Sequence, residues 1–296
     1  MSFTAKDVQE LRARTGAGMM DCKKALEAND GDTEKAIEFL RAKGIAKAET
    51  RAGRTASEGR IVALVADDAR TAAILELNCE TDFVGRNDEF VALTTALAEQ
   101  VLADESLDGT VRVASEGNLL AQPWKGDPSK TVDQMVKEAS ARTGENLVVR
   151  RYARFVSDGA LGAYVHHNGK VAALVDITGS KSAPAIALAK QIAEHAAAGV
   201  PTVPLSVSKD EVPAEAVEKE RRIFTEQAKA SGKPDNIIQK MIEGRIAKYF
   251  TEVALVEQPW VRDDKQSIRQ LVAAAGLEAG SSLLVHRFAR FQMGEE

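Results

Sequence analysis

Cysteine and aromatic residues are both scarce in this chain of 296 residues. Its two cysteines, Cys22 and Cys79, are too few to form a disulfide framework. Residues 1–7 contain no apolar signal segment, so a reducing, cytoplasmic compartment is the simplest expectation. Aromatic residues make up only 5% of the chain, so its hydrophobic cores must be built from aliphatic side chains and alanine.

Long hydrophobic runs and an excess of positive charge are also missing. No run of about 18 apolar residues is present, so no membrane-spanning helix is expected. Lys and Arg number 39 against 44 Asp and Glu, a net charge of −5, whereas proteins that bind nucleic acid usually carry a basic excess. Residues 41–60 are a local exception, with six basic side chains against two acidic ones. We interpret them as a solvated helix end and linker.

The sequence also lacks the motifs of common catalytic and ligand sites. No Gly-x-x-x-x-Gly-Lys run is present, so a nucleotide-binding P-loop is not expected. No strand precedes the glycines at 16 and 18, so a dinucleotide-binding loop is not expected there either. Cys79 has no histidine at a spacing that supports catalysis. His166 and His167 are neighbours in an expected strand and should point to opposite faces, which disfavours a shared metal. We therefore expect no catalytic residue, no cofactor and no metal.

Residues 1–55 contain three short helical patterns, which predict a compact helical head. The first pattern begins at Thr4, whose hydroxyl can cap the helix. The second follows a glycine turn at residues 16–18. The third begins at residue 32 or 33 and is expected to end at Gly44, with inward-facing Ala36, Ile37, Phe39 and Leu40.

Two adjacent methionines, Met19 and Met20, begin the second helical pattern. Methionine fills gaps in hydrophobic cores, and it also forms adaptable contact surfaces. Residue type alone favours a place in the core of the head, with a contact surface as the alternative.

A segment of the chain occurs twice. Residues 57–65 match residues 157–165, and residues 71–77 match residues 171–177, both at an offset of 100. Residues 57–65 and 71–77 predict one β-hairpin, and residues 157–165 and 171–177 predict a second. Residues 147–155 match residues 283–291 at an offset of 136 and predict a third strand in each copy. We infer two homologous α+β modules, each with a small antiparallel three-stranded sheet, in which Trp124 and Trp260 occupy equivalent packing positions.

The two copies differ by insertions, and insertions in a duplicated plan indicate where function differs. Residues 96–101 match residues 187–192 at an offset of 91, so the first copy carries nine extra residues within 78–89. The later offset of 136 gives the second copy 45 extra residues, roughly 199–249. The short insertion places Phe83 and Val84 in a polar loop, where Phe83 either contacts a partner or plugs its own core.

The long insertion predicts two helices joined by a turn at residues 231–235. The first helix carries Val217, Phe224 and Ala228 on one face, and the second carries Ile238, Met241, Ile242 and Tyr249. Pro234 suits the first position of the second helix. Such an antiparallel helical hairpin either protrudes as an arm for self-association or partner binding, or folds back on its own domain.

Four motifs now resemble those of the bacterial elongation factor Ts family. Residues 11–26, LRARTGAGMMDCKKAL, are similar to its amino-terminal signature, and residues 76–84, ELNCETDFV, are similar to its second signature. Residues 231–234, SGKP, and 241–245, MIEGR, resemble its helical arm. The resemblance covers nearly the whole chain in the right order.

The resemblance implies a fold and a division into domains. These are a UBA-like three-helix head with a basic linker at 1–55, a first core subdomain at 56–156, a second core subdomain at 157–200 and 251–296, and a coiled-coil arm for dimerisation at 201–250. It also implies a function in protein biosynthesis. Members of the family are guanine-nucleotide exchange factors, not enzymes, which bind the GDP-bound and nucleotide-free forms of elongation factor Tu in the cytoplasm.

The resemblance further implies which residues bind the partner. Thr81, Asp82, Phe83 and Val84 match the loop that dislodges Mg²⁺ from elongation factor Tu. In the head, Arg12, Met19 and Met20 match contact positions, and His166 is a weaker match in the second subdomain. No membrane and no direct nucleic-acid contact is implied. Some members continue into a further helix beyond the position of Glu296, and any contact made by that helix is not expected here. The alternative is a non-catalytic adaptor or an RNA-associated scaffold that uses the head and the basic linker.

Overall fold

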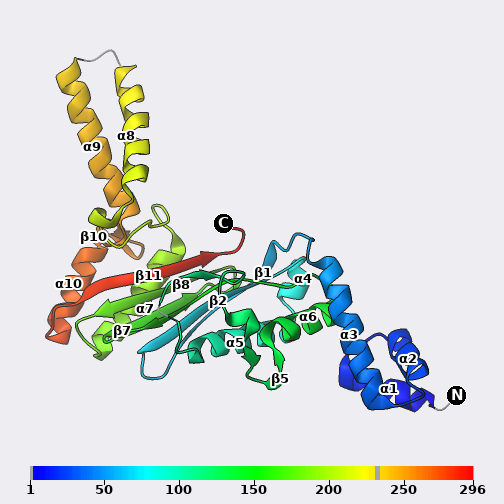
Figure 1. The fold of residues 1–296 in the computed structure, drawn as a ribbon. Helices are drawn as coiled ribbons and strands as arrows, with labels where there is room; N and C mark the ends of the chain where they lie inside the picture. The colour runs from blue at the N-terminus through cyan, green and yellow to red at the C-terminus, as the bar shows by residue number, and fades with distance from the viewer. Residues whose placement is uncertain (1–2, 108, 231–233, 296) are drawn as a thin grey trace.

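The computed structural model describes residues 3–107, 109–230 and 234–295, and of Lys47 only the backbone. Helices and small antiparallel sheets are mixed in it, as expected for the α+β class. Figure 1 shows an elongated molecule with three helices at the N-terminal end, the sheets in the middle and a helical pair projecting at the far end. No helix in the described ranges combines the length and apolarity that a membrane span requires.

The N-terminal helices are α1 (Ala5–Thr15), α2 (Met19–Ala28) and α3 (Thr33–Arg51). The side chain of Thr4 caps α1, and Gly16 ends it with a φ of 67°, a left-handed conformation that glycine adopts without strain. These three helices bury a small aliphatic core composed of Val8, Leu11, Cys22, Ala25, Leu26, Ala36 and Leu40.

The expected end of the third helix at Gly44 is wrong, because α3 continues to Arg51. Its second half packs on α6 (Val132–Thr143). A Cβ atom at Gly44 would lie 3.0 Å from that of Ala141, so this glycine permits the close approach of two helices and does not end one. Phe39 was expected to face inward, but it is 40% exposed because the core of the head is completed without it.

The basic segment at 41–60 contains the end of α3, in agreement with the predicted helix end, but several of its charges are ion-paired and not simply solvated. Arg41 pairs with Glu138 of α6 at 2.6 Å, and Lys43 pairs with Asp21 of α2 at 2.9 Å. Arg54, just beyond the helix, pairs with Glu80 at 3.3 Å. Local charge therefore ties the head to the first copy of the duplicated module.

The first copy contains a four-stranded antiparallel sheet, one strand more than expected. Its order is β1 (Glu58–Val65), β2 (Thr71–Cys79), β6 (Val148–Val156) and β3 (Arg112–Val113). The additional strand, β3, has only two residues, which is too short to leave a pattern in the sequence. The second copy has the expected three strands in the order β11 (Leu284–Gln292), β8 (Val171–Thr178) and β7 (Ala160–Val165). Both predicted hairpins are present.

Equivalent helices cover the outer faces of the two sheets. In the first copy these are α5 (Asp88–Ala103) and α6, with η1 (Leu119–Ala121) and a ribbon of β4 (Pro123–Trp124) and β5 (Asp127–Thr131). In the second copy they are α7 (Ala183–Ala198) and α10 (Ile268–Ala279), with η3 (Leu255–Glu257), β9 (Pro259–Trp260) and β10 (Asp263–Ser267). Trp124 and Trp260 pack against the two cores at equivalent positions, as predicted.

The inner faces of the two sheets pack on each other through a third apolar cluster, which includes Ile61, Ile74, Phe155, Leu174 and Phe291. Two arginines close this interface symmetrically. The guanidinium of Arg151 lies 4.5 Å from the ring centroid of Phe291, and that of Arg287 lies 4.4 Å from the ring centroid of Phe155. The duplication is thus also a structural pairing of the two copies.

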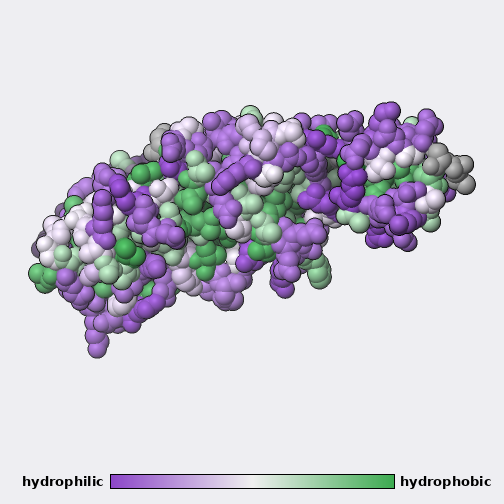
Figure 2. All heavy atoms as spheres, turned by 90° about the horizontal axis from the view of Figure 1, so that it is seen from below, coloured by the Kyte–Doolittle hydropathy of each residue, from purple (hydrophilic) through white to green (hydrophobic). Residues whose placement is uncertain are grey.

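The long insertion forms the projecting pair of helices in Figure 1, α8 (Ala214–Lys229) and α9 (Asp235–Val253), preceded by η2 (Lys209–Glu211). The two helices bury their apolar faces against each other, including Phe224, Ile238 and Ile242. Pro234 precedes the first helical residue instead of occupying it. Residues 231–233 of the turn predicted at 231–235 lie outside the described residues. Figure 2, a view from below, shows a mostly hydrophilic surface with hydrophobic patches over the middle and at the end opposite the head.

Candidate functional site

The short insertion forms a one-turn helix, α4 (Asp82–Gly85), directly after β2. Thr81 precedes it, and its hydroxyl accepts a hydrogen bond from the amide of Val84 at 3.4 Å. The helix sits close to β1, since a Cβ atom at Gly85 would lie 3.1 Å from the carbonyl oxygen of Gly59. Phe83 is 84% exposed, which rules out that this side chain plugs its own core. A large aromatic ring is therefore held in solvent on a short, anchored turn.

The four residues of this turn have different environments. Val84 packs inward against the first core, whereas Phe83 points outward. Asp82 pairs with Arg86 at 3.0 Å across one helical turn, on a partly exposed surface where such pairs contribute little to stability. The ring of Phe83 is thus the apolar feature that this turn offers to another molecule.

Glu145 holds the turn from the other side, and the sequence reasoning missed it. Its Oε2 accepts hydrogen bonds from the amides of Glu80 and Thr81, both at 3.0 Å, and its Oε1 accepts one from the Thr81 hydroxyl at 2.6 Å. The equivalent residue of the second copy, at the offset of 136, is Ser281, which donates to the carbonyl of Gly179. The copy that has the insertion carries a carboxylate at this position, whereas the copy that lacks it carries a hydroxyl. This difference between the copies could have identified Glu145 from the sequence.

A second set of contacts connects this turn to the head. Oε1 of Glu80 accepts from the amide of Asn146 at 2.7 Å and from Arg54. The side-chain amide of Asn146 donates to the carbonyls of Ala52 and Arg54, which directly follow α3. The position of the Phe83 turn is therefore coupled to the end of the helix that carries the head.

In the head, the preference for a core position of the two methionines is wrong. Met19 and Met20 are both exposed, the latter by 62%, because the inward positions of α2 belong to Cys22, Ala25 and Leu26. Arg12, on α1, is also exposed. The head therefore presents apolar and basic side chains at the start of α2 and on α1.

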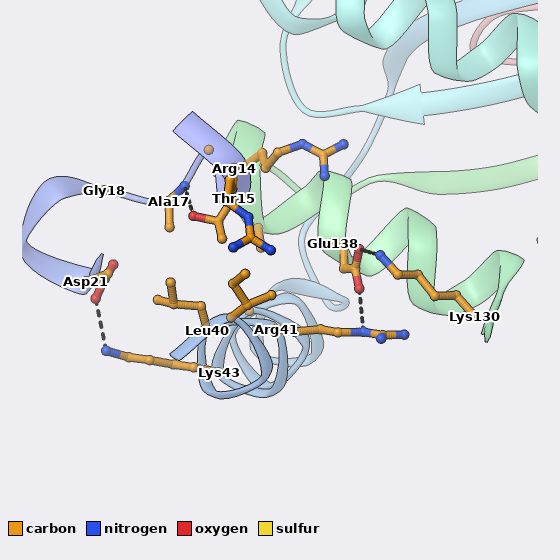
Figure 3. Close-up of a pocket in the computed structure, with 15 residues that line it drawn as sticks. Arg14, Thr15, Ala17, Gly18, Asp21, Leu40, Arg41, Lys43, Lys130 and Glu138 are labelled. Carbon is orange, nitrogen blue, oxygen red and sulfur yellow. Dashed lines mark hydrogen bonds and ion pairs between the residues drawn. The ribbon is translucent and has the colours of Figure 1, made fainter. Parts of the chain in front are cut away.

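A cavity of about 310 Å³ lies between the head and α6 (Figure 3). The glycine turn at 16–18 forms one wall, and α3 and α6 form the others. In Figure 3 the side chains of Arg41 and Lys130 approach Glu138, and Lys43 approaches Asp21. Its charged lining residues are thus largely satisfied by one another, which favours a structural junction over a ligand site.

His166 lies in the turn between β7 and β8, not in a strand as expected. Its ring centroid is 4.2 Å from that of His167, so the two rings lie side by side and do not point to opposite faces. Nδ1 of His166 is 3.1 Å from the hydroxyl of Tyr164. The structure thus places the candidate residues in three separate regions: the turn after β2, the head helices α1 and α2, and the β7–β8 turn.

Cys79 is buried at the end of β2, and its thiol donates to the carbonyl of Thr81 at 3.1 Å. Burial, with a smaller effect from the charge of Glu145, raises the pKa of this thiol to about 12. The thiol therefore stays protonated and has a packing role. Within the described ranges, no three His, Cys, Asp or Glu residues are grouped so as to hold a metal ion.

Comparison with known proteins gives one consistent result. The family model described as Elongation factor TS matches residues 80–295. Proteins named Elongation factor Ts from Clostridium botulinum (strain Alaska E43 / Type E3) and Methylococcus capsulatus are 42% and 45% identical to this chain, over 99% and 100% of its length and 93% of their own. The similar protein from Trichlorobacter lovleyi is 41% identical over 100% of this chain and 94% of its own length.

Proposed function

This chain belongs to the elongation factor Ts family, and on that premise we propose that it is a guanine-nucleotide exchange factor for elongation factor Tu. It acts by binding in the cytoplasm during translation elongation and catalyses no covalent step. It binds the GDP-bound form, dislodges Mg²⁺, and remains on the nucleotide-free form until GTP enters.

The observation that carries this proposal is the exposure of Phe83 on an anchored turn. Tight nucleotide binding by a GTPase needs Mg²⁺ and an ordered phosphate-binding loop. A rigidly presented aromatic ring that inserts between partner helices favours a conformation that holds Mg²⁺ poorly, without touching the nucleotide. The contacts of Glu145 with the amide and hydroxyl of Thr81 hold the turn in place and support this wedge role.

The coupling between the two ligands is reciprocal. If the exchange factor lowers the affinity of the GTPase for nucleotide, the nucleotide lowers the affinity for the factor by the same amount. GDP therefore leaves from a ternary complex, and incoming GTP then releases the factor.

Replacement of Phe83 by Ala tests the wedge. Stopped-flow release of fluorescent GDP from elongation factor Tu should slow at least about tenfold, the effect of losing about 1.4 kcal/mol of stabilisation. Because Phe83 is 84% exposed, the variant should fold normally. The matched control is Leu284→Ala, an exposed apolar residue on β11, which should leave release unchanged. Normal release by the Phe83→Ala variant would show that the ring is not the wedge.

The other candidate residues extend the contact. We place Arg12, Met19 and Met20 of the head against the GTPase domain of the partner, with support from their exposure. His166 is a further contact, on the β7–β8 turn of the second subdomain. The domain boundaries proposed are 1–55 for a UBA-like head, 56–156 and 157–200 with 251–296 for two core subdomains, and 201–250 for the arm.

We also propose that the arm is a coiled coil that mediates self-association. Its inner faces are already filled by α8 and α9 themselves. The exposed Ile223 and Ile237 therefore remain as apolar positions for a second chain. Sedimentation should give a dimer for the intact chain and a monomer after Ile223→Glu and Ile237→Glu. A monomer at all concentrations of the intact chain would contradict a dimerising arm.

A further inference from the structure

A groove of about 700 Å³ lies between α10, the start of β11 and the segment that contains η2. Its walls are mostly apolar, and two of its leucines are among the most exposed large hydrophobic side chains described. Leu277 of α10 is 86% exposed, and Leu284 at the start of β11 is 63% exposed. We call this the α10 groove. Leucines exposed to this extent at a concave surface indicate an interaction site.

The duplication shows what an equivalent surface does in the first copy. At the offset of 136, α10 corresponds to α6, and Leu277 corresponds to Ala141. In the first copy this face of α6 is covered by a helix, α3. Ala141 lies against Gly44, and Arg51 donates to the carbonyl of Ser140 at 3.3 Å. The sister surface of the α10 groove is thus a helix seat.

We propose that the α10 groove seats an amphipathic α-helix of a partner protein, packed on α10 as α3 packs on α6. This is recognition of a helix by an apolar groove. The site is separate from the Phe83 turn, and the proposal does not depend on nucleotide exchange.

The substitutions between the copies define the chemistry of the helix that fits. Lys137 of α6 pairs with Glu49 of α3, and Glu138 pairs with Arg41. The equivalent residues of α10 are Ala273 and Ala274. The ion pairs that border the first seat therefore have no equivalent in the second, and a leucine replaces Ala141. The α10 groove selects an apolar helix face without charged flanks.

The charges that do line the groove already have partners. Arg269 pairs with Glu257, and Glu211 accepts a hydrogen bond from Ser208. An apolar helix therefore enters without leaving one of these charges unpaired.

The occupant comes from another protein because the described helices of this chain are engaged elsewhere. Helix α3 covers α6, and α8 and α9 bury their apolar faces in each other. The segments next to α10 in the chain are β10 and β11, which are paired in sheets. The same engagements hold in a second copy. Its arm exposes a single large hydrophobic side chain on each described helix, Ile223 and Ile237, which is too little to fill an apolar groove, so a helix of different origin is required.

The test uses the intact chain and a fluorescent, hydrocarbon-stapled peptide with the sequence of residues 33–51. In this peptide, Arg41→Leu and Glu49→Leu replace the two charged residues that pair with α6 in the first copy. Fluorescence anisotropy should show saturable binding. The double substitution Leu277→Lys with Leu284→Lys should weaken binding at least tenfold. The control Val111→Lys, an exposed position just before β3, should change binding by less than twofold.

Methyl NMR spectra of the intact chain provide a second readout. Peptide binding should shift the signals of Leu277 and Leu284 more than those of the arm. The proposal is overturned if the peptide does not bind, if the double variant binds equally well, or if the shifts lie elsewhere. It is also overturned if the chain dimerises in a way that Leu277→Lys alone abolishes, since the groove then belongs to a second copy.

Discussion

Glu145 binds Thr81 through both of its carboxylate oxygens, to the backbone amide at 3.0 Å and to the hydroxyl at 2.6 Å. The two residues are 64 positions apart in the sequence. Glu145 follows α6, and Thr81 begins the turn that presents Phe83. The exposed ring is thus positioned by the helix that also seats α3.

Replacement of Glu145 by Ala should therefore impair exchange without unfolding the protein. Three hydrogen bonds to the turn are lost, but the site is partly exposed, so water can satisfy the donors. We expect stimulated GDP release to slow about three- to tenfold, equivalent to about 0.7–1.4 kcal/mol, with a small fall in Tm. Glu145→Gln, which keeps one acceptor oxygen, should be intermediate. Glu278→Ala, on the exposed face of α10, is the control. Unchanged release by Glu145→Ala would mean that the turn is rigid without the carboxylate.

Sequence comparison within the chain predicted more of this fold than helical periodicity did. The offsets of 100, 91 and 136 located both hairpins, the third strands and both insertions, because a duplicated core repeats its buried positions. Gly44, by contrast, reads locally as a helix end. Its place in the middle of α3 depends on the close contact with Ala141, which is 97 positions away and leaves no local pattern.

The candidate site was predictable in part for the same reason. The nine-residue insertion pointed to Phe83, and the exposure of its ring agrees with a contact role. Met19 and Met20 were misassigned because residue type does not report which face of a ten-residue helix is covered. Glu145 was missed because a carboxylate after a helix is common. Only its comparison with Ser281 in the second copy distinguishes it.

Met20 is the most exposed of the large hydrophobic side chains described in the head, so its contact role can be tested by introducing a charge. Because its side chain is 62% exposed, Met20→Asp should leave the stability of the head unchanged. If Met20 contacts elongation factor Tu, burial of an unpaired carboxylate should weaken the complex at least tenfold in isothermal titration calorimetry. Val261→Asp, at an exposed position between β9 and β10, serves as the matched control. Equal affinities of the two variants would remove Met20 from the interface.

Breaking the buried ion pair at the contact between the two sheets should strongly destabilise the core. Arg151 pairs with Glu76 at 2.7 Å, and the side chain of Glu76 is only 1% exposed. Arg151→Leu leaves this carboxylate buried without its partner and should cost about 3–5 kcal/mol in urea unfolding. The double variant with Glu76→Leu should recover much of that loss, because no buried charge remains. The exposed pair of Arg221 and Glu218 gives the control, and Arg221→Leu should cost less than about 1 kcal/mol.

His195 should make stability depend on pH in a defined direction. It is fully buried in α7; its Nδ1 accepts from the amide of Val261 at 3.2 Å, and its Nε2 donates to Gln258 at 2.9 Å. Burial lowers the pKa of this imidazole below its ordinary value of 6.5, despite the opposing hydrogen bond to Gln258. The neutral form is therefore favoured in the folded state, and the unfolded chain binds the extra proton first.

The stability contributed by neutral His195 is consequently complete above pH 6.5 and is lost as pH falls from there through the lower folded pKa. His195→Gln removes this titration, so the difference in unfolding free energy between the intact chain and the variant should shrink from pH 8 to pH 5. Urea unfolding at intervals of half a pH unit measures it. Asn168→Ala, which removes an exposed side chain without a titrating group, should give a difference that does not change with pH. A gap that stays constant for His195→Gln as well would mean that the buried ring takes up a proton as readily as one in the unfolded chain.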